Sequence, residues 1–247
     1  MDAQGGVAVI LAAGVGKRLK NWDLPKSLLS FVGCSLLERH IQTLRGLGID
    51  DIHIIGGHRI DALSDELHRI GDSAKLVFNA AYMRGSMLSL LTQAPLLRSG
   101  KPVVLMDADV LFAPQILKKL VESSHANSLL VDMHFVDEEA VKLCFMGDEI
   151  VDFHKRPERA YDRCGESVGF FAFSPAMAVA LADRCDHYVS LGMLDLEYEA
   201  PLRDLLIDQP GAFGAEDITG LPWIEIDFDA DIDRANLEIV PKLEMVA

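Results

Sequence analysis

The segment Val7–Leu29, VAVILAAGVGKRLKNWDLPKSLL, decides the fold. It opens with the apolar run Val7–Leu11, which is typical of a buried parallel strand. The run ends in the small residues of AAGVG, which let a ligand lie against the backbone. Cationic side chains follow at Lys17, Arg18, Lys20 and Lys26. Because exposed backbone N–H groups and cationic side chains both attract anions, this loop is predicted to bind phosphate.

Two common phosphate-binding motifs do not fit this loop. The dinucleotide fingerprint G-x-G-x-x-G needs a third glycine where Leu19 stands. The P-loop needs Ser or Thr where Arg18 stands, and its first glycine is replaced by Leu11. What remains, L-A-A-G-x-G-x-R-L followed by P-K, resembles the signature of nucleotidyltransferases that load a nucleoside monophosphate onto a phosphorylated acceptor. The AAG turn, the arginine and the Pro-Lys pair occur together, so the match is specific.

Composition excludes several classes of protein. The net charge of −15 argues against nucleic-acid binding, and no apolar run reaches the length of a membrane span, so no membrane insertion is expected. The N-terminus lacks the basic region of a secretory signal. The four cysteines are scattered without a C-x-x-C pair, and we expect reduced thiols in a cytoplasmic protein.

Strand-like and helix-like segments alternate up to about residue 127. This order predicts an α/β fold with a doubly wound, mostly parallel, Rossmann-like sheet and helices on both faces. The predicted strands are Val7–Leu11, Asp51–Gly57, Lys75–Phe78 and Val103–Met106. The predicted helices are Gly33–Leu47, Arg59–Ile70, one capped by Ser86 and running to about Leu97, and one that opens at Pro114.

A mixed or antiparallel section is predicted after residue 127. Its strands are Leu129–His134, Val141–Phe145, Ile150–His154 and Val168–Phe173, and the strand Pro222–Asp227 comes last. Its helices are Pro175–Cys185, Glu199–Ile207 and Ala230–Leu237. No linker or repeat interrupts the chain, so we expect one domain over residues 1–240, with this mixed-strand C-terminal elaboration, and a tail over 241–247.

Carboxylates follow predicted strand ends, where open parallel sheets bind ligands. Asp107 and Asp109 come after the strand VVLM, and Glu225 and Asp227 belong to the last strand. Mg²⁺ prefers such oxygen ligands together with phosphates and water. The sequence therefore predicts a Mg²⁺ site that faces the Gly14 loop.

The superfamily that the chain resembles is that of the MobA-like NTP transferases. The resemblance implies a role for each of the cations and carboxylates named above. In that family an Asp after the central strand and an Asp near the C-terminus hold the metal; Asp109 and Asp227 match them, and Glu225 or Asp107 is the next ligand. Arg18 matches the arginine that binds the β- and γ-phosphates, and Lys26 the lysine that neutralises the α-phosphate. The expected nucleotide-binding residues are Leu11, Ala12, Ala13, Gly14, Gly16, Lys17 and Asp107.

Within the superfamily, residues 5–240 most resemble the small cytidylyltransferases for phosphocholine, inositol-1-phosphate and phosphonates. The expected acceptor-binding residues are Lys155, which matches a lysine near the acceptor phosphate, Glu166 and Arg84. Phosphocholine enzymes carry aromatic residues where Arg84 stands, and a quaternary ammonium relies on such rings. We therefore expect phosphocholine to be a poor acceptor, and a polyol phosphate or an amino- or hydroxyalkyl phosphonate to serve better.

These features predict a Mg²⁺-dependent cytidylyltransferase that transfers CMP from CTP to a small phospho-alcohol or phosphonate and releases pyrophosphate. The alternatives are a sugar-1-phosphate nucleotidylyltransferase that uses another NTP and a catalytically silent regulatory homologue. The sequence leaves open the acceptor, the base and the oligomeric state, a homodimer included. Trp223 is interpreted as a core residue. Asp195, Glu197 and Glu199 are interpreted as a solvated acidic turn, the alternative being that they reach the acceptor.

Overall fold

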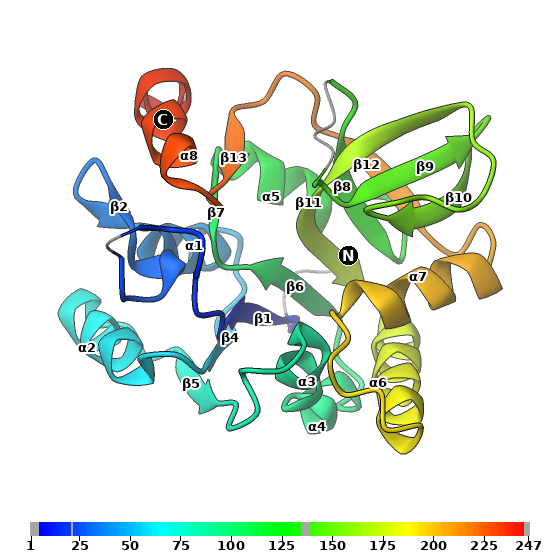
Figure 1. Ribbon diagram of the computed structural model, residues 1–247, viewed down its shortest axis with the longest axis horizontal. Coiled ribbons are helices and arrows are strands. Elements are labelled where there is room, and N and C mark those ends of the chain that lie inside the picture. Colours follow the sequence, from blue (N-terminus) through cyan, green and yellow to red (C-terminus); the bar gives the residue numbers. More distant parts are fainter. Residues whose placement is uncertain (1–4, 21, 135–138, 245–247) are drawn as a thin grey trace.

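The computed structural model describes residues 5–20, 22–134 and 139–244, and its centre is a nine-stranded sheet (Figure 1). The parallel part has the order β6-β1-β4-β5, and β1 pairs with both β4 and β6. These strands are β1 (Val7–Ala12), β4 (Asp51–Gly56), β5 (Lys75–Phe78) and β6 (Val103–Asp107). The four strands predicted before residue 127 are thereby confirmed.

The long strand β11 (Arg163–Phe173) joins the parallel part to the antiparallel part. One edge of β11 pairs with β6 and, further along, with β9; the other edge pairs with β8. Around it lie β8 (Ser128–Asp132), β9 (Lys142–Met146), β10 (Glu149–His154) and β12 (Gly214–Asp217). The predicted α/β fold with a mixed-strand elaboration is confirmed, although β12 had not been predicted.

Helices cover both faces of the sheet. One face carries α1 (Leu36–Gly46), α2 (Ile60–Ile70) and α5 (Pro114–Val121). The other face carries α3 (Ser86–Leu91), α4 (Ala94–Leu97), α6 (Pro175–Ser190) and α7 (Glu199–Asp208). Successive side chains of a strand point to opposite faces, so Val9 packs in one core and Ile10 in the other. This double burial explains the continuous apolar run that β1 shows in the sequence.

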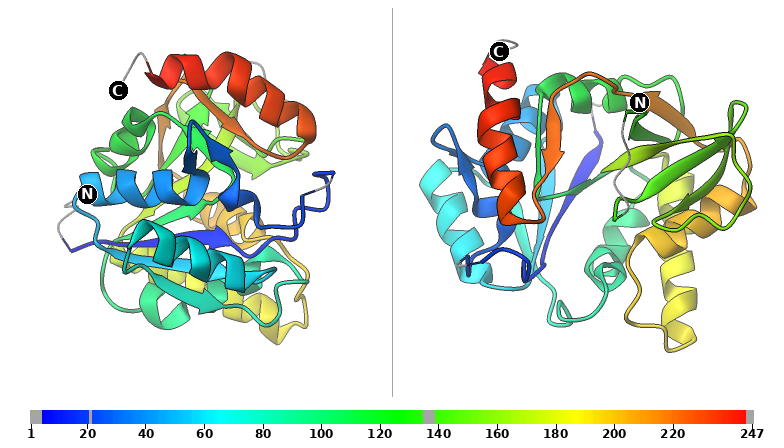
Figure 2. Two further views of the ribbon diagram at one scale, coloured as in Figure 1. Left: turned by 90° about the vertical axis from the view of Figure 1, so that its left-hand side faces the viewer. Right: turned by 45° about the horizontal axis from the view of Figure 1, so that its top comes forward.

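A third core joins the first loop to the C-terminal segment. It contains Leu19 and Phe31 from the N-terminal part, and Ile224, Ile226 and Ile239 from the C-terminal part. Figure 2 shows the C-terminal helical segment lying along β13. The elements are β7 (Val110–Phe112), which pairs antiparallel with β13 (Trp223–Glu225), then α8 (Asp229–Arg234), a π-helical turn (Ala235–Ile239) and α9 (Val240–Glu244). Helix therefore continues past residue 240, where the tail had been expected to begin.

Two helix starts differ from the prediction. A hairpin of β2 (Ser30–Phe31) and β3 (Cys34–Ser35) occupies the residues before α1, and its turn at Val32 and Gly33 has φ of 53° and 72°. Positive φ at both central positions is the requirement of a type I′ hairpin turn. Helix α3 is capped by Gly85, not Ser86, because the Ser86 hydroxyl instead accepts the N–H of Tyr198.

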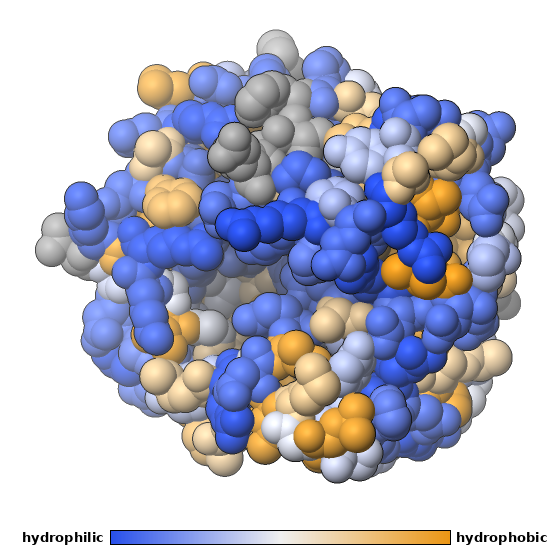
Figure 3. All heavy atoms as spheres, turned by 45° about the vertical axis from the view of Figure 1, so that its right-hand side comes forward, coloured by the Kyte–Doolittle hydropathy of each residue, from blue (hydrophilic) through white to orange (hydrophobic). Residues whose placement is uncertain are grey.

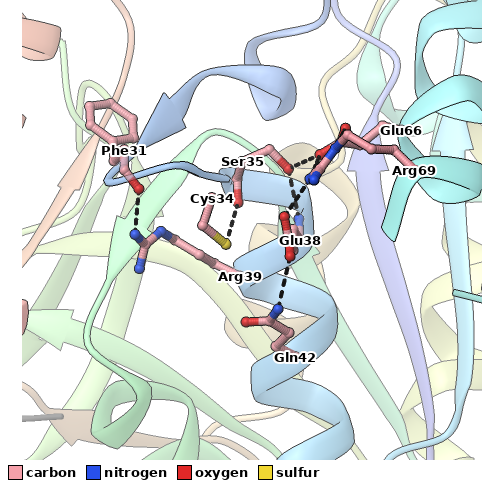
Figure 4. A network of polar contacts seen from close by, with 8 residues as sticks. All are labelled: Phe31, Cys34, Ser35, Glu38, Arg39, Gln42, Glu66 and Arg69. Carbon is pink, nitrogen blue, oxygen red and sulfur yellow. Dashed lines mark hydrogen bonds and ion pairs between the residues drawn. The ribbon is translucent and has the colours of Figure 1, made fainter. Parts of the chain in front are cut away.

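Polar contacts surround the start of α1 (Figure 4). Ser35 caps the helix by accepting the N–H of Glu38 at 3.0 Å, and its hydroxyl also donates to Glu66 of α2. Arg69 of α2 pairs with the carboxylates of both Glu38 and Glu66. The contacts tie α1 to α2, and α1 carries the buried His40, whose ring lies 3.1 Å from the backbone oxygen of Asp107 at the end of β6.

In the part of the chain that the structure describes, no helix is long and apolar enough to cross a membrane. All four cysteines are free thiols.

The candidate active site

Two adjoining cavities open where the parallel strands end. The loop cavity, of about 500 Å³, lies over the Gly14 loop, and the β11 cavity, of about 580 Å³, lies between β11 and β13. Figure 3 shows this face hollowed near its middle, with hydrophilic side chains around the hollow. The residues that line both cavities are Asp107, Lys155, Tyr198, Glu199, Glu225 and Asp227. Molecules bound in the two cavities would therefore meet along a common wall.

The structure puts all seven predicted nucleotide-binding residues, Leu11, Ala12, Ala13, Gly14, Gly16, Lys17 and Asp107, on the wall of the loop cavity. Gly16 has φ of 65°, and a Cβ there would lie 3.3 Å from the Cγ of Lys26. The loop thus turns back onto Lys26 at a position that suits glycine.

Lys26 and Arg18 lie in one ion cluster with two of the predicted metal ligands. The Nζ atom of Lys26 lies 2.9 Å from Asp109 Oδ2 and 2.6 Å from Asp227 Oδ1, and Arg18 Nη1 lies 2.6 Å from Asp227 Oδ2. Burial disfavours the Lys26 ammonium, but the two carboxylates outweigh it and raise the pKa of Lys26. Burial likewise opposes the charge of Asp227, yet Lys26 and Arg18 hold its pKa below the usual value.

Asp109, Glu225 and Asp227 form an acidic triad. One carboxylate oxygen of each lies within 4.8 Å of the others, an arrangement that can hold a metal ion. Although Glu225 borders the open cleft, the protein around it limits its hydration and the carboxylates of Asp109 and Asp227 repel its charge. Both effects raise the pKa of Glu225 to about 8.

The position of Glu225 and Asp227 corrects one expectation. They do not follow a strand of the main sheet, because β13 pairs only with β7 in a separate two-stranded sheet. The third core presses this small sheet against the first loop. Packing therefore brings these carboxylates to the strand ends, by a route that the order of strands does not reveal.

Asp107 lies apart from the triad and has other partners. Its Oδ2 accepts the Tyr198 hydroxyl at 2.6 Å. Burial, together with the charges of Glu199 and Asp109, raises the pKa of Asp107 well above its usual value. Gly169, with φ of 77°, leaves room for this carboxylate, because a Cβ there would lie 2.2 Å from Oδ2. Between the two candidates for a third metal ligand, the geometry thus favours Glu225.

The three predicted acceptor-binding residues are not brought together. Lys155 borders both cavities, whereas Glu166 lines the β11 cavity and Arg84 the loop cavity. The guanidinium of Arg84 is already held by Asp195 through two hydrogen bonds of 2.7 Å. Its charge is therefore compensated within the chain.

Some lining residues had not been assigned to the site. Tyr198 precedes α7 as its N-cap residue, Glu199 begins α7, and both border the two cavities. Trp223 lines the β11 cavity, and its indole N–H donates to Asp132 at 2.9 Å. The interpretation of Glu199 as part of a solvated turn is wrong, since its Oε2 atom is buried. No motif marks this segment; only the packing of α7 against the sheet brings it to the cleft.

Comparison with known proteins identifies the family. A model of the MobA-like NTP transferase domain matches residues 8–147, more than half of the chain. The chain belongs to the MobA-like NTP transferase family. This membership confirms the resemblance that the sequence motifs indicated, and it makes the chain a member of a family of nucleotidyltransferases.

Two relatives of this MobA-like chain match over almost its whole length. A bifunctional IPC transferase and DIPP synthase of Rubrobacter xylanophilus is 29% identical over 241 residues, which are 96% of this chain and 52% of that protein. The chain thus spans about half the length of that relative. A CTP:phosphoglutamine cytidylyltransferase of Campylobacter jejuni is 24% identical over 249 residues, which cover 92% of this chain and 97% of the relative.

Solved structures share the fold of this MobA-like chain. The inositol-1-phosphate CTP transferase from T. maritima superposes with a TM-score of 0.76 at 24% identity, covering 98% of this chain and 97% of that one. The CTP:phosphocholine cytidylyltransferase from Streptococcus pneumoniae gives 0.74 at 21% identity, covering 94% and 98%.

Proposed function

We propose that the protein is a cytidylyltransferase, which transfers CMP from CTP to a small phosphorylated or phosphonate acceptor and releases pyrophosphate. The observation that carries the proposal is the common wall of the two cavities. The loop cavity offers the glycine-rich loop, Arg18 and Lys26, a set suited to a triphosphate. Lys155 stands at the border with the β11 cavity, where a second phosphate can approach the first.

In the proposed reaction, an acceptor phosphate or phosphonate oxygen attacks the α-phosphorus of CTP in line with the leaving group. A bond forms between that oxygen and the α-phosphorus while the bond from the α-phosphorus to the bridging oxygen breaks, and pyrophosphate leaves with the electron pair. The attacking oxygen is already an anion, so no general base is needed. The chain supplies position and positive charge: Lys26 at the α-phosphate, Arg18 at the β- and γ-phosphates, and Lys155 at the acceptor.

The residues present fit a divalent metal ion. The donors of the triad are three carboxylates close together, and hard oxygen ligands are those that Mg²⁺ prefers. We assign Asp109, Asp227 and Glu225 as the residues that would hold Mg²⁺. When bound, the ion would neutralise phosphate charge and help to orient the triphosphate.

The choice of CTP rests on the relatives, three of which are named for CTP or cytidylyl transfer. A sugar-1-phosphate enzyme with another NTP is the rival within the class. We further propose that residues 1–240 act as one domain in the cytoplasm, a location that suits four free thiols.

The test is a pyrophosphate-release assay with each of the four NTPs and a panel of acceptors: inositol-1-phosphate, glucose-1-phosphate, phosphocholine and 2-aminoethylphosphonate. We expect release only with Mg²⁺, fastest with CTP, and only when an acceptor is present. A preference for another NTP with glucose-1-phosphate would favour the sugar-nucleotide alternative. No release with any combination would favour a silent homologue.

A further inference from the structure

The β11 cavity contains a buried carboxylate oxygen that nothing in the described chain satisfies. Glu199 begins α7, and its side chain borders both cavities. Its Oε2 atom is buried and has no hydrogen-bond partner among the described residues. Such an atom loses its hydration without compensation, which is costly for a carboxylate.

Other carboxylates of the β11 cavity have partners within the chain. Asp107 accepts the Tyr198 hydroxyl, Asp132 accepts the Trp223 indole N–H, and Asp227 is paired with Lys26 and Arg18. Asp231 accepts the backbone N–H groups of Asp227 and Phe228. Glu199 does not belong to the acidic triad that can hold a metal. None of the described residues therefore supplies a hydrogen-bond partner for the Oε2 atom of Glu199.

The charge of the cavity defines what that partner must supply. Eight carboxylate residues line it: Asp107, Asp132, Glu139, Glu166, Glu199, Glu225, Asp227 and Asp231. The cationic lining residues are Lys155 and Arg234, with His134 as a titratable neighbour. A hydroxyl group could donate to Glu199 but would leave the charge of its carboxylate uncompensated. An ammonium group both donates and compensates the charge.

We propose that the acceptor carries an ammonium group and that Glu199 binds it. The inference rests on the proposed transferase function and specifies its acceptor. Lys155 and Glu199 stand on the same wall, so a short zwitterion can place its phosphate or phosphonate at the lysine and its ammonium at the glutamate. The pKa of Glu199 is consistent with this assignment. Without a ligand, burial raises the pKa of Glu199 to about 7, and the charge of Lys155 opposes that rise. A ligand ammonium would restore the charged form.

Arg84 was one ground for expecting a polyol phosphate or a phosphonate in place of phosphocholine, but its charge is compensated by Asp195. Aromatic side chains do line the β11 cavity, at Phe153, Tyr198, Trp223 and Phe228. Both a primary and a quaternary ammonium could therefore find contacts there, by hydrogen bonds or by π faces. The charge is what the two have in common.

The decisive experiment compares two acceptors that differ only in carrying an ammonium or a hydroxyl group. Initial rates of CMP transfer are measured with 2-aminoethylphosphonate and 2-hydroxyethylphosphonate, and kcat/KM is obtained for each. We expect the amine to be preferred by at least about 30-fold, as for a buried charge pair. Phosphoethanolamine and phosphocholine, run beside them, distinguish a primary from a quaternary ammonium. A preference for phosphocholine supports the ammonium but contradicts the prediction made from the Arg84 segment.

The variant Glu199→Gln should reduce the amine-to-hydroxyl preference to within about threefold, mainly through KM for the amine. Its control is Glu149→Gln, which removes an exposed carboxylate that lines neither cavity and should leave the preference intact. A wild-type enzyme that uses the hydroxyl acceptor or inositol-1-phosphate as well as the amine overturns the proposal, while the transferase function stands. Absence of pyrophosphate release with every NTP and acceptor contradicts the function itself.

Discussion

Lys26 Nζ lies 2.6 Å from Asp227 Oδ1, although 201 positions of sequence separate the two residues. The contact joins the first loop to the C-terminal segment, and both residues line the loop cavity. Arg18 strengthens the junction, because it pairs with Asp227 and its guanidinium lies 5.3 Å from the ring centroid of Phe228. The proposed nucleotide site thus includes residues from both ends of the chain.

The variant Lys26→Ala should lower kcat by about 10²- to 10³-fold, because it removes a charge that is held in place for the transition state. Steady-state pyrophosphate release measures the effect, and circular dichroism checks that the variant is folded. The matched control is Lys20→Ala, which should retain its rate because Lys20, although a cation of the same loop, is exposed and does not line the loop cavity. Turnover of Lys26→Ala within a few-fold of wild type would remove the lysine from the reaction.

Asp109→Asn and Asp227→Asn should each abolish Mg²⁺-dependent turnover, and the double variant should be no worse than the poorer single one. The two effects are expected to be non-additive because both residues would act through one ion. Asp229→Asn, next to the site on α8, should keep a normal Mg²⁺ response. Activity that survives excess EDTA in the wild type would contradict the metal assignment.

Gly169→Ala should lower the free energy of unfolding by more than backbone strain alone would, because the new Cβ would meet the Asp107 carboxylate. Its φ of 77° is nearly that of Gly211, at 76°, but only Gly169 has a neighbour where a Cβ would stand, the Asp107 carboxylate. We expect Gly211→Ala to cost about 1 kcal/mol of unfolding free energy, and Gly169→Ala at least about 1 kcal/mol more. Urea denaturation of both variants checks the difference; equal losses would mean that Asp107 simply moves aside.

Glu199 should make the ligand-free protein less stable as the pH rises. Burial raises its pKa from 4.5 to about 7 in the folded state, so between these values the folded chain binds more protons than the unfolded one. Stability then falls as the pH rises through this window, by on the order of 2–3 kcal/mol in total. Glu199→Gln removes the effect, so relative to wild type the variant should gain stability between pH 5 and pH 8. A stability difference that is constant over this range, measured by urea unfolding, would contradict the burial of an unpaired charge.

Local patterns predicted much of the architecture. The apolar run of β1 and the helical spacing of Leu37, Ile41 and Leu44 depend on near neighbours in the chain, so their secondary structure could be read directly. The hairpin before α1 was missed because it depends on positive φ at Val32, a β-branched residue that rarely adopts it. The strand β12 was missed because it is short and pairs with β8, more than eighty residues earlier.

By itself, the sequence determined the α/β class, the glycine-rich loop with its cations and the carboxylates available for a metal, since these follow from residue type and local spacing. Only the tertiary structure decided which of those carboxylates meet: it grouped Glu225 with Asp109 and Asp227, turned Asp107 toward Tyr198, and tied up Arg84 with Asp195. It also placed Glu199, which no sequence motif marks, in the lining of both cavities. The physical reason is that contacts between distant segments are fixed by packing of the whole chain, here by the third core, which no window of sequence contains.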